Sequence, residues 1–309
     1  MSNKIYTEIQ TKIVKMLEVS LTLKYQKSWF SVGNMAKNPI SNAFYTGFNQ
    51  LYLSFIADDK NYSINKWLTF KQASELKGVI IKGEKATPVM YYNRVFKNEK
   101  GENIQSNEVQ KLINSTGKTL AELKITSNGF LRFYFVFNVA QISGLPESFY
   151  KTDGTVLTDI EKIEVAEQIL INSKANIKHK FIDEAYYMPS KDLIVLPDTS
   201  QFKNSLVYYS TAFHELSHWT GAAHRLNRVF GKFFKSKEYA FEELVAELST
   251  ALVCGSLSIT KDFTNNTAYI KSWIAAFKND VTIFFKAAAF AQKSADYILA
   301  FNQELKQVA

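Results

Sequence analysis

Residues 214–218 read His-Glu-Leu-Ser-His, inside a stretch from Asn204 to Trp219 whose apolar spacing predicts a helix. Residues four apart lie on one helix face, so His214 and His218 can direct a ring nitrogen at one metal ion. Glu215 lies one step around the helix and can act as a general base beside that ion. The motif therefore predicts a hydrolytic metal site, because a chance match is rare in a chain with only four histidines.

The third protein ligand has two candidates, and the first is His224. The run from His214 to His224 is similar to the metzincin signature, which implies His224 as a ligand. Metzincins also need a methionine turn after the motif. All five methionines of this chain precede it, so this reading lacks a required part.

The second candidate is Glu243, on a predicted helix from Tyr239 to Cys254. Glu243 and Glu247 are four apart and share a face of that helix. Glu243 can bind the metal while Glu247 accepts a hydrogen bond from a ligand histidine. This pattern resembles the gluzincin metallopeptidases, whose second carboxylate is Asp. We favour Glu243 over His224 and expect Glu242 to face solvent.

The expected ion is Zn²⁺ or another divalent transition metal. Three protein ligands leave one position for water, whose pKa falls to about 7 on zinc. Glu215 would accept the proton and pass it to a leaving amine. A tyrosine or a histidine would stabilise the oxyanion, and His224 is one candidate.

Length and composition exclude several classes of protein. The chain has 309 residues, enough for two domains, and its single cysteine, Cys254, excludes an intramolecular disulfide. No apolar run approaches the ~18 residues of a membrane span, and the N-terminus lacks the pattern of a signal peptide. We therefore expect a cytoplasmic protein with no membrane partner.

The positive net charge lies entirely in the first half. Residues 1–150 hold 19 lysines and arginines against 11 aspartates and glutamates, whereas residues 151–309 hold 18 of each. Aromatic residues alternate with the lysines of this half, and such combinations stack on unpaired bases and contact phosphates, although many of the rings must belong to the core. The candidate DNA contacts are Lys24, Lys27, Trp29, Tyr45, Asn49, Trp67, Lys71, Lys82, Lys85 and Arg94.

We predict an α+β chain of two domains, residues 1–150 and 151–309, with residues 97–128 inserted in the first. A hairpin is expected between residues 79–81 and 88–96. The resemblance to zincin metallopeptidases implies a sheet edge beside the helix that carries His214 and His218, and Asp192–Pro197 is expected to fill that place. The other elements are helices at 4–18, 49–57, 70–76, 106–116, 159–172, 264–278 and 280–304, and strands at 130–139, 177–187 and 193–196.

Several motifs resemble ArdC-type antirestriction proteins in order along nearly the whole chain. In the first half they lie around Tyr45–Asn49, Trp67–Gln72, Lys82–Lys85 and Phe137–Pro146. In the second half they are Phe213–Gly221, Arg225–Arg228 and Glu242–Glu247. The resemblance implies a single-stranded-DNA-binding domain joined to a zincin-like metallopeptidase domain. It also implies carriage on mobile elements and protection of incoming DNA from restriction.

Three functions remain open. The first is a peptidase that is recruited to single-stranded DNA and acts on DNA-bound proteins. The second is a non-catalytic protein that shields incoming single-stranded DNA and has a structural metal site. The third is a peptidase whose basic half binds something other than DNA. Glu215 favours an enzyme, because a structural site needs no general base.

Overall fold

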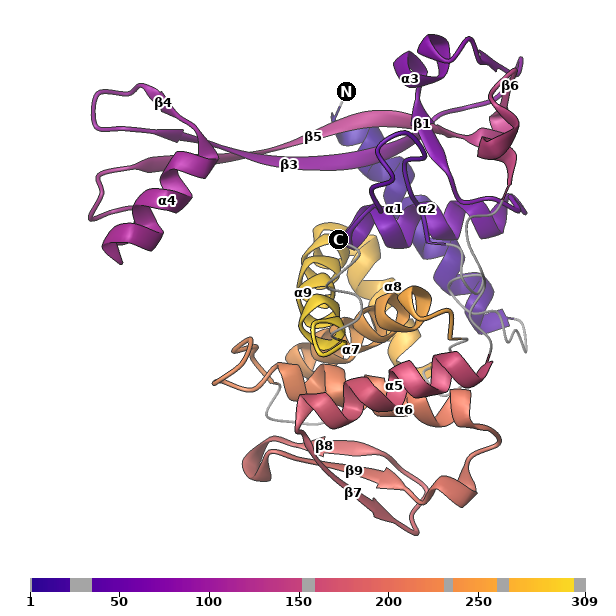
Figure 1. Cartoon of the computed structure of the whole chain (residues 1–309), viewed down its shortest axis with the longest axis vertical. Helices are drawn as coiled ribbons and strands as arrows, with labels where there is room; N and C mark the ends of the chain where they lie inside the picture. Colours follow the sequence, from indigo (N-terminus) through magenta and orange to yellow (C-terminus); the bar gives the residue numbers. More distant parts are fainter. Residues whose placement is uncertain (1, 23–34, 152–158, 231–235, 260–266, 303–309) are drawn as a thin grey trace.

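A long antiparallel ribbon dominates the N-terminal half and extends out of the body of the molecule (Figure 1). The computed structural model describes residues 2–22, 35–151, 159–230, 236–259 and 267–302. In the ribbon, β3 (Thr87–Lys97) pairs with β5 (Thr126–Asn138) along all 11 residues of β3. The strand order of this sheet is β1-β5-β3-β4, with β1 at Trp67–Thr69 and β4 at Asn103–Ile104.

The predicted hairpin between residues 79–81 and 88–96 is wrong. β2 (Val79–Ile80) pairs instead with β6 (Ile142–Ser143), and β3 pairs with β5. Proximity along the chain suggested the hairpin. A ladder along the whole of β3 forms more backbone hydrogen bonds and cross-strand contacts than a strand of two residues can offer.

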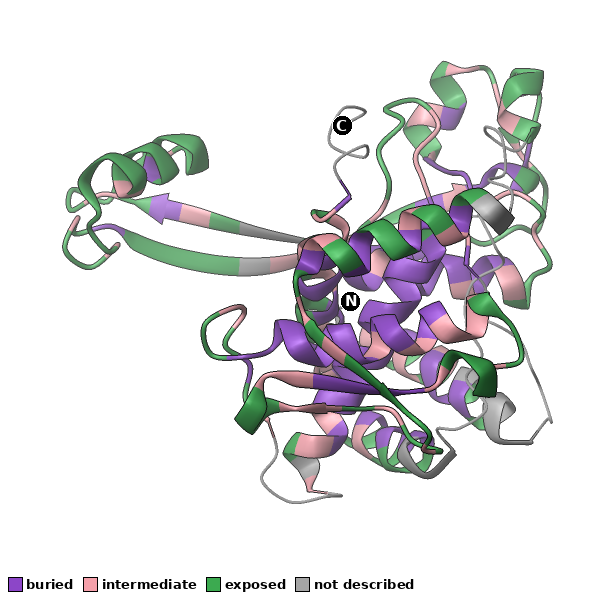
Figure 2. Cartoon of the chain, turned by 60° about the horizontal axis from the view of Figure 1, so that its bottom comes forward, coloured by how far each residue is buried: buried purple, intermediate pink, exposed green. Residues whose placement is uncertain are grey.

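The segment between β3 and β5 closes the far end of the ribbon. The predicted helix at 106–116 is confirmed as α4 (Ser106–Thr116), which packs on a small separate core around Phe96, Val109 and Ile125. Figure 2 shows that most of this arm is exposed, while the helices of the body are largely buried. The assignment of residues 97–128 as an insertion remains a prediction.

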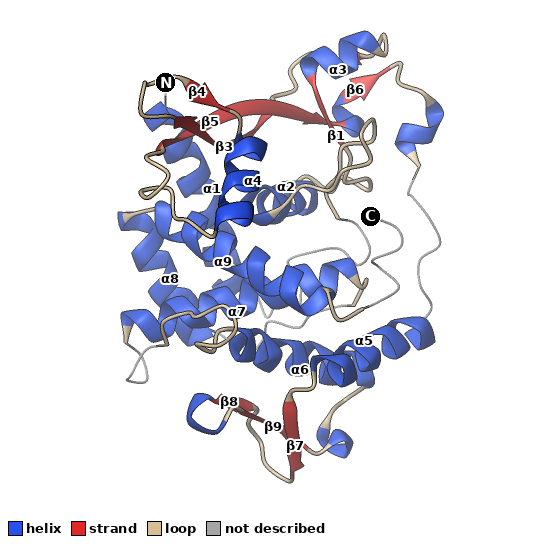
Figure 3. Cartoon of the chain, turned by 60° about the vertical axis from the view of Figure 1, so that its left-hand side comes forward, coloured by secondary structure: helices blue, strands red, loops and turns tan. Residues whose placement is uncertain are grey.

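A second sheet lies beneath helices α5 (Asp159–Ser173) and α6 (Ser205–Thr220) (Figures 1 and 3). Its order is β7-β9-β8, with β7 at Asn176–Lys180, β8 at Tyr186–Met188 and β9 at Leu193–Pro197. The predicted single strand over 177–187 is therefore two strands. β9 is central and β8 is an edge, so the expectation that Asp192–Pro197 forms the sheet edge is wrong.

The two halves share one hydrophobic core. Helix α1 packs on α8, and α2 packs on α9, so the first two and the last two helices of the described chain pack together in pairs. Thr69 caps α3 with a complete capping box. The division at residue 150 remains a prediction. The remaining helices are α1 (Ser2–Thr22), α2 (Gly47–Asp59), α3 (Phe70–Glu75), α7 (Lys237–Ser256), α8 (Thr267–Asn279) and α9 (Thr282–Leu299).

Within the described part of the chain, no helix combines the length and the apolar character that a membrane span needs.

Candidate metal centre

Helix α6 brings His214 and His218 together. Asn204 caps the helix by accepting a hydrogen bond from the Val207 N–H at 3.0 Å. The histidines follow one turn apart on one face, and their Nε2 atoms lie 3.3 Å from each other. Two imidazole nitrogens of neighbouring turns thus converge on one point, as the motif predicts.

Helix α7 supplies the third group, the carboxylate of Glu243. Its Oε2 lies 3.6 Å from His214 Nε2, and its Oε1 lies 3.6 Å from His218 Nε2. Ligand atoms of the three residues lie within 4.8 Å of one another. The three side chains remain between 11 and 17% exposed, so an ion can reach them from solvent.

His224 lies apart from this cluster. Its side chain is 65% exposed, and its Nε2 is 3.5 Å from Asp192 Oδ2. The neighbouring Arg225 also pairs with Asp192 and stacks on the Trp219 ring at 3.7 Å. Within the described ranges, the group able to hold a metal contains Glu243 and not His224.

Both metal-facing histidines are held from behind by a carboxylate. His214 Nδ1 lies 3.3 Å from Glu247 Oε1, the position expected for Glu247. His218 Nδ1 lies 3.2 Å from Glu242 Oε1. The expectation that Glu242 faces solvent is therefore wrong, since Glu242 is buried. Each carboxylate fixes one ring so that its Nε2 points at the cluster.

A buried arginine neutralises Glu242. Arg228 donates from Nη2 to Glu242 Oε1 at 2.7 Å and from Nε to Oε2 at 3.0 Å. It also donates hydrogen bonds to the Ser217 carbonyl and the Thr220 hydroxyl, both on α6. A buried guanidinium with these partners aligns Glu242 firmly.

Gly221 makes room for this arginine. A Cβ at Gly221 would lie 2.8 Å from Arg228 Nη2 and 2.7 Å from the Phe230 ring. The backbone there is ordinary right-handed helix, with φ −77° and ψ −9°. Gly221 occupies the glycine position of the metzincin-like motif. Here its missing side chain leaves space for Arg228, and its backbone forms no unusual turn.

Glu215 is buried beside the edge strand of the second sheet. The backbone N–H of Tyr187, on β8, donates a hydrogen bond to its carboxylate. Burial nevertheless raises the pKa of Glu215 above its usual range. A carboxyl group with a raised pKa takes up a proton more readily near neutral pH, as a general base must.

The charges of the cluster are strongly coupled. Burial acts to lower the pKa of His214, but Glu247 and Glu243 outweigh it and raise that pKa to about 10. The pKa of His218 is raised in the same way against burial, chiefly by Glu242. The pKa values of Glu242 and Glu243 are lowered, because their charged partners outweigh burial. Without a metal, His214 is therefore protonated near neutral pH.

These residues fit a divalent transition metal. Two imidazole nitrogens and one carboxylate are a ligand set that such ions accept while leaving a position open. Both rings have the hydrogen-bonded partner that ligand histidines usually have. The cluster also contains three buried carboxylates, Glu242, Glu243 and Glu247, whose negative charge a divalent ion would balance.

The predicted DNA-contacting residues are scattered. Lys24, Lys27 and Trp29 lie outside the described residues. Trp67 is fully buried and donates to Asn65 Oδ1, so the prediction that it contacts DNA is wrong. Tyr45 and Asn49 line one groove on the surface. The other four, which are exposed and lie outside that groove, are Lys71, Lys82, Lys85 and Arg94.

Sequence reasoning missed the partnership of Glu242, Arg228 and Gly221. Glu242 precedes the expected ligand by one position, where helical spacing gives no reason to expect a shared role. Arg228 lies 14 residues before Glu242 in the chain. All three fall within the motifs that resemble the ArdC-type proteins, which is the one signal that pointed to them.

Two family models match the chain. The N-terminal domain of anti-restriction factor ArdC matches residues 3–134, and a zincin-like metallopeptidase matches residues 164–290. Two Escherichia coli proteins named DNA primase TraC are 37% and 34% identical over 97% of this chain, which spans only 20% and 27% of their lengths. The uncharacterized protein y4eC of Sinorhizobium fredii is 29% identical, with 98% of this chain and 94% of y4eC covered.

Two solved structures of one relative also align with this chain. The metal-free crystal structure of the antirestriction ArdC protein from plasmid R388 has a TM-score of 0.74 and 32% identity, covering 96% of this chain and 97% of that one. The Mn(II)-bound structure of the same protein has a TM-score of 0.72 at 32% identity, covering 96% and 98%. The fold is thus α+β with a zincin-like second domain, and the chain belongs to the ArdC family of two-domain antirestriction proteins.

Proposed function

We propose that this antirestriction protein binds single-stranded DNA and is a metal-dependent peptidase acting on proteins bound to that DNA. The convergence of His214, His218 and Glu243, with Glu215 buried beside an edge strand, is the observation that most supports the peptidase. A purely structural site would need neither Glu215 nor solvent access.

Each residue of the centre has a proposed task. His214, His218 and Glu243 would hold Zn²⁺ or another divalent transition metal, which supplies Lewis acidity at a scissile carbonyl when bound. Glu215 would accept a proton from the attacking water and deliver it to the leaving amine. Glu242 and Glu247 would keep the two rings oriented.

The edge strand offers a place for the substrate. β8 pairs with β9 on one side only in the described sheet, and its Tyr187 lies against Glu215. An extended peptide can add to such an edge through main-chain hydrogen bonds. This arrangement favours unfolded or flexible protein segments as substrates.

The DNA part rests on different grounds. The charge excess of the first half and its match to the N-terminal domain of an antirestriction factor both favour a polyanion. We propose that the protein acts in the cytoplasm, where it would protect the incoming DNA of a mobile element. The relatives named DNA primase TraC are consistent with a role in conjugation.

The peptidase is tested with Glu215→Gln. The purified chain is loaded with Zn²⁺ or Mn²⁺ and incubated with fluorescein-labelled casein, with and without a (dT)30 oligonucleotide. We expect the variant to bind the metal like wild type and to lose roughly 10²-fold or more of the hydrolysis. Glu164→Gln, an exposed carboxylate on α5, is the matched control.

Two results would count against the peptidase. Equal hydrolysis by wild type and Glu215→Gln would remove Glu215 as the base. No hydrolysis by wild type with either metal, together with protection of (dT)30 from nuclease, would favour the DNA-shielding alternative with a structural metal. Binding to the oligonucleotide is measured separately, against a duplex of equal length and across a salt series.

A further inference from the structure

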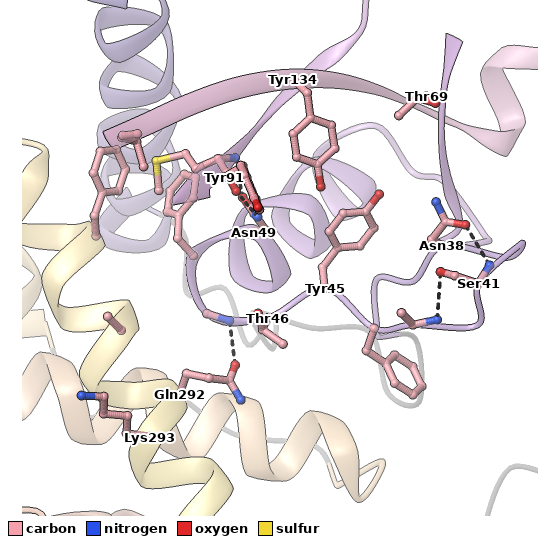
Figure 4. Close-up of a pocket in the computed structure, with 18 of the residues that line it drawn as sticks. Asn38, Ser41, Tyr45, Thr46, Asn49, Thr69, Tyr91, Tyr134, Gln292 and Lys293 are labelled. Carbon is pink, nitrogen blue, oxygen red and sulfur yellow. Dashed lines mark hydrogen bonds between the residues drawn. The ribbon is translucent and has the colours of Figure 1, made fainter. Parts of the chain in front are cut away.

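A groove of about 970 Å³ lies where the N-terminal half meets helix α9 (Figure 4). One wall consists of the loop before α2 together with β3 and β5. The opposite wall is α9, from the second half of the chain. The volume lies near the upper end of the roughly 300–1,000 Å³ of small-molecule sites, so more than one base would fit. The side chains used below are Phe44, Tyr45, Tyr91, Tyr134, Lys286 and Lys293.

We propose that this composite groove holds consecutive unpaired nucleotides, with bases on its aromatic wall and phosphates on the lysines of α9. The proposal rests on the single-stranded DNA binding proposed above. It places part of the DNA site outside the first 150 residues, on a helix that neither charge nor composition singled out.

Exposed rings on one wall are the first observation. Phe44 is 59% exposed, Tyr91 is 51% exposed and Tyr134 is 37% exposed. Figure 4 shows Tyr134 projecting from β5 toward Tyr45, so two rings from different elements meet inside the groove. Large rings left in solvent around one groove suit stacking on flat bases, which tolerates any base sequence.

The charge of the lining is the second observation. Lys286 and Lys293 are exposed and lie two helical turns apart on α9. Among the described residues that line the groove, there is no aspartate or glutamate. An apolar peptide would contact the rings but not the lysines. A nucleic acid strand would contact both, since phosphates alternate with bases along it.

Helix α9 is fixed to both halves of the molecule. On its groove side, Gln292 Oε1 accepts a hydrogen bond from the Gly47 N–H at 2.6 Å. On its buried side, Ser294 Oγ lies 2.8 Å from Thr220 Oγ1 on α6 and 2.9 Å from Ser249 Oγ on α7. A strand in the groove would therefore be held in a fixed position relative to the metal centre.

The lysines are tested in the full chain with the double variant Lys286→Ala/Lys293→Ala. Each phosphate contact to a single strand contributes about 0.7 to the slope of log K against log salt. We expect the slope for fluorescein-labelled (dT)30 to become shallower by about 1.4 and binding at 0.1 M salt to weaken by about 25-fold. Lys178→Ala/Lys180→Ala, two exposed lysines on β7 in the other sheet, should leave both quantities unchanged.

The rings are tested with Tyr91→Ala and the conservative Tyr91→Phe. Loss of one stacking ring should weaken binding by about 5- to 150-fold, and Tyr91→Phe should restore it. If wild type binds (dT)30 but the lysine and ring variants bind equally well, the groove is not the site. Binding of a duplex as tightly as (dT)30 would also overturn the proposal. If wild type binds no oligonucleotide, the proposed function itself fails first.

Discussion

The Glu242→Gln variant is expected to weaken both the metal centre and the fold. The Glu242 carboxylate lies 3.2 Å from His218 Nδ1 and accepts two hydrogen bonds from Arg228. The Glu242 and Arg228 side chains are only 5 and 3% exposed, so the arginine would lose its counter-charge in a buried place. Removing one partner of such a pair costs about 3–5 kcal/mol. We expect the lower end, because the amide oxygen can still accept one hydrogen bond.

The metal effect has a separate magnitude. Loss of the carboxylate behind a ligand histidine typically lowers metal affinity by about 10- to 100-fold. That range corresponds to about 1.4–2.7 kcal/mol of binding free energy. The two losses are measured independently, by urea unfolding of the metal-free protein and by competition for Mn²⁺ against a chelator of known affinity.

A second variant separates the two effects. Arg228→Met/Glu242→Gln removes both charges, and replacing a buried pair by apolar or neutral groups is often close to neutral for stability. We expect the double variant to regain much of the stability while still binding Mn²⁺ weakly. Glu164→Gln is the surface control. If the Glu242→Gln variant has the same free energy of unfolding and the same Mn²⁺ affinity as wild type, Glu242 neither orients His218 nor neutralises Arg228.

Three further predictions concern the same centre. His224→Ala should leave Mn²⁺ affinity unchanged, since this exposed side chain lies outside the cluster; loss of the metal in elemental analysis would restore it as the third ligand. Gly221→Ala should destabilise the protein by about 1–3 kcal/mol in urea unfolding, because the new Cβ would overlap Arg228 and Phe230, and an unchanged midpoint would contradict that geometry. Because the pKa of His214 is raised to about 10, Mn²⁺ must displace a proton, and affinity should rise about tenfold per pH unit between pH 7 and 9. The metal-free protein should lose stability over the same range, since a raised histidine pKa stabilises the fold at low pH and ceases to do so as the pH approaches 10; a flat profile in both titrations would refute the proton assignment.

The predicted helices and strands show where local information is sufficient. The helices at 106–116 and 159–172 follow from apolar spacing, and the Thr69 cap follows from its side-chain chemistry. The predicted hairpin was wrong because a strand can pair with any available strand edge, including one far along the chain. The prediction that Trp67 contacts DNA was wrong because burial depends on tertiary packing. The local sequence around an aromatic residue beside lysines is the same whether the ring faces solvent or the core.

The sequence by itself determined the spacing of His214, Glu215 and His218, the exclusion of an intramolecular disulfide and the charge excess of residues 1–150, because these are properties of neighbours or of composition. Only the tertiary structure placed Glu243, and not His224, beside the two histidines, gave Glu242 its partners, and brought α9 against the aromatic wall of the groove. Those contacts join residues far apart in the chain. Their geometry follows from how whole helices pack, and no local pattern encodes that packing.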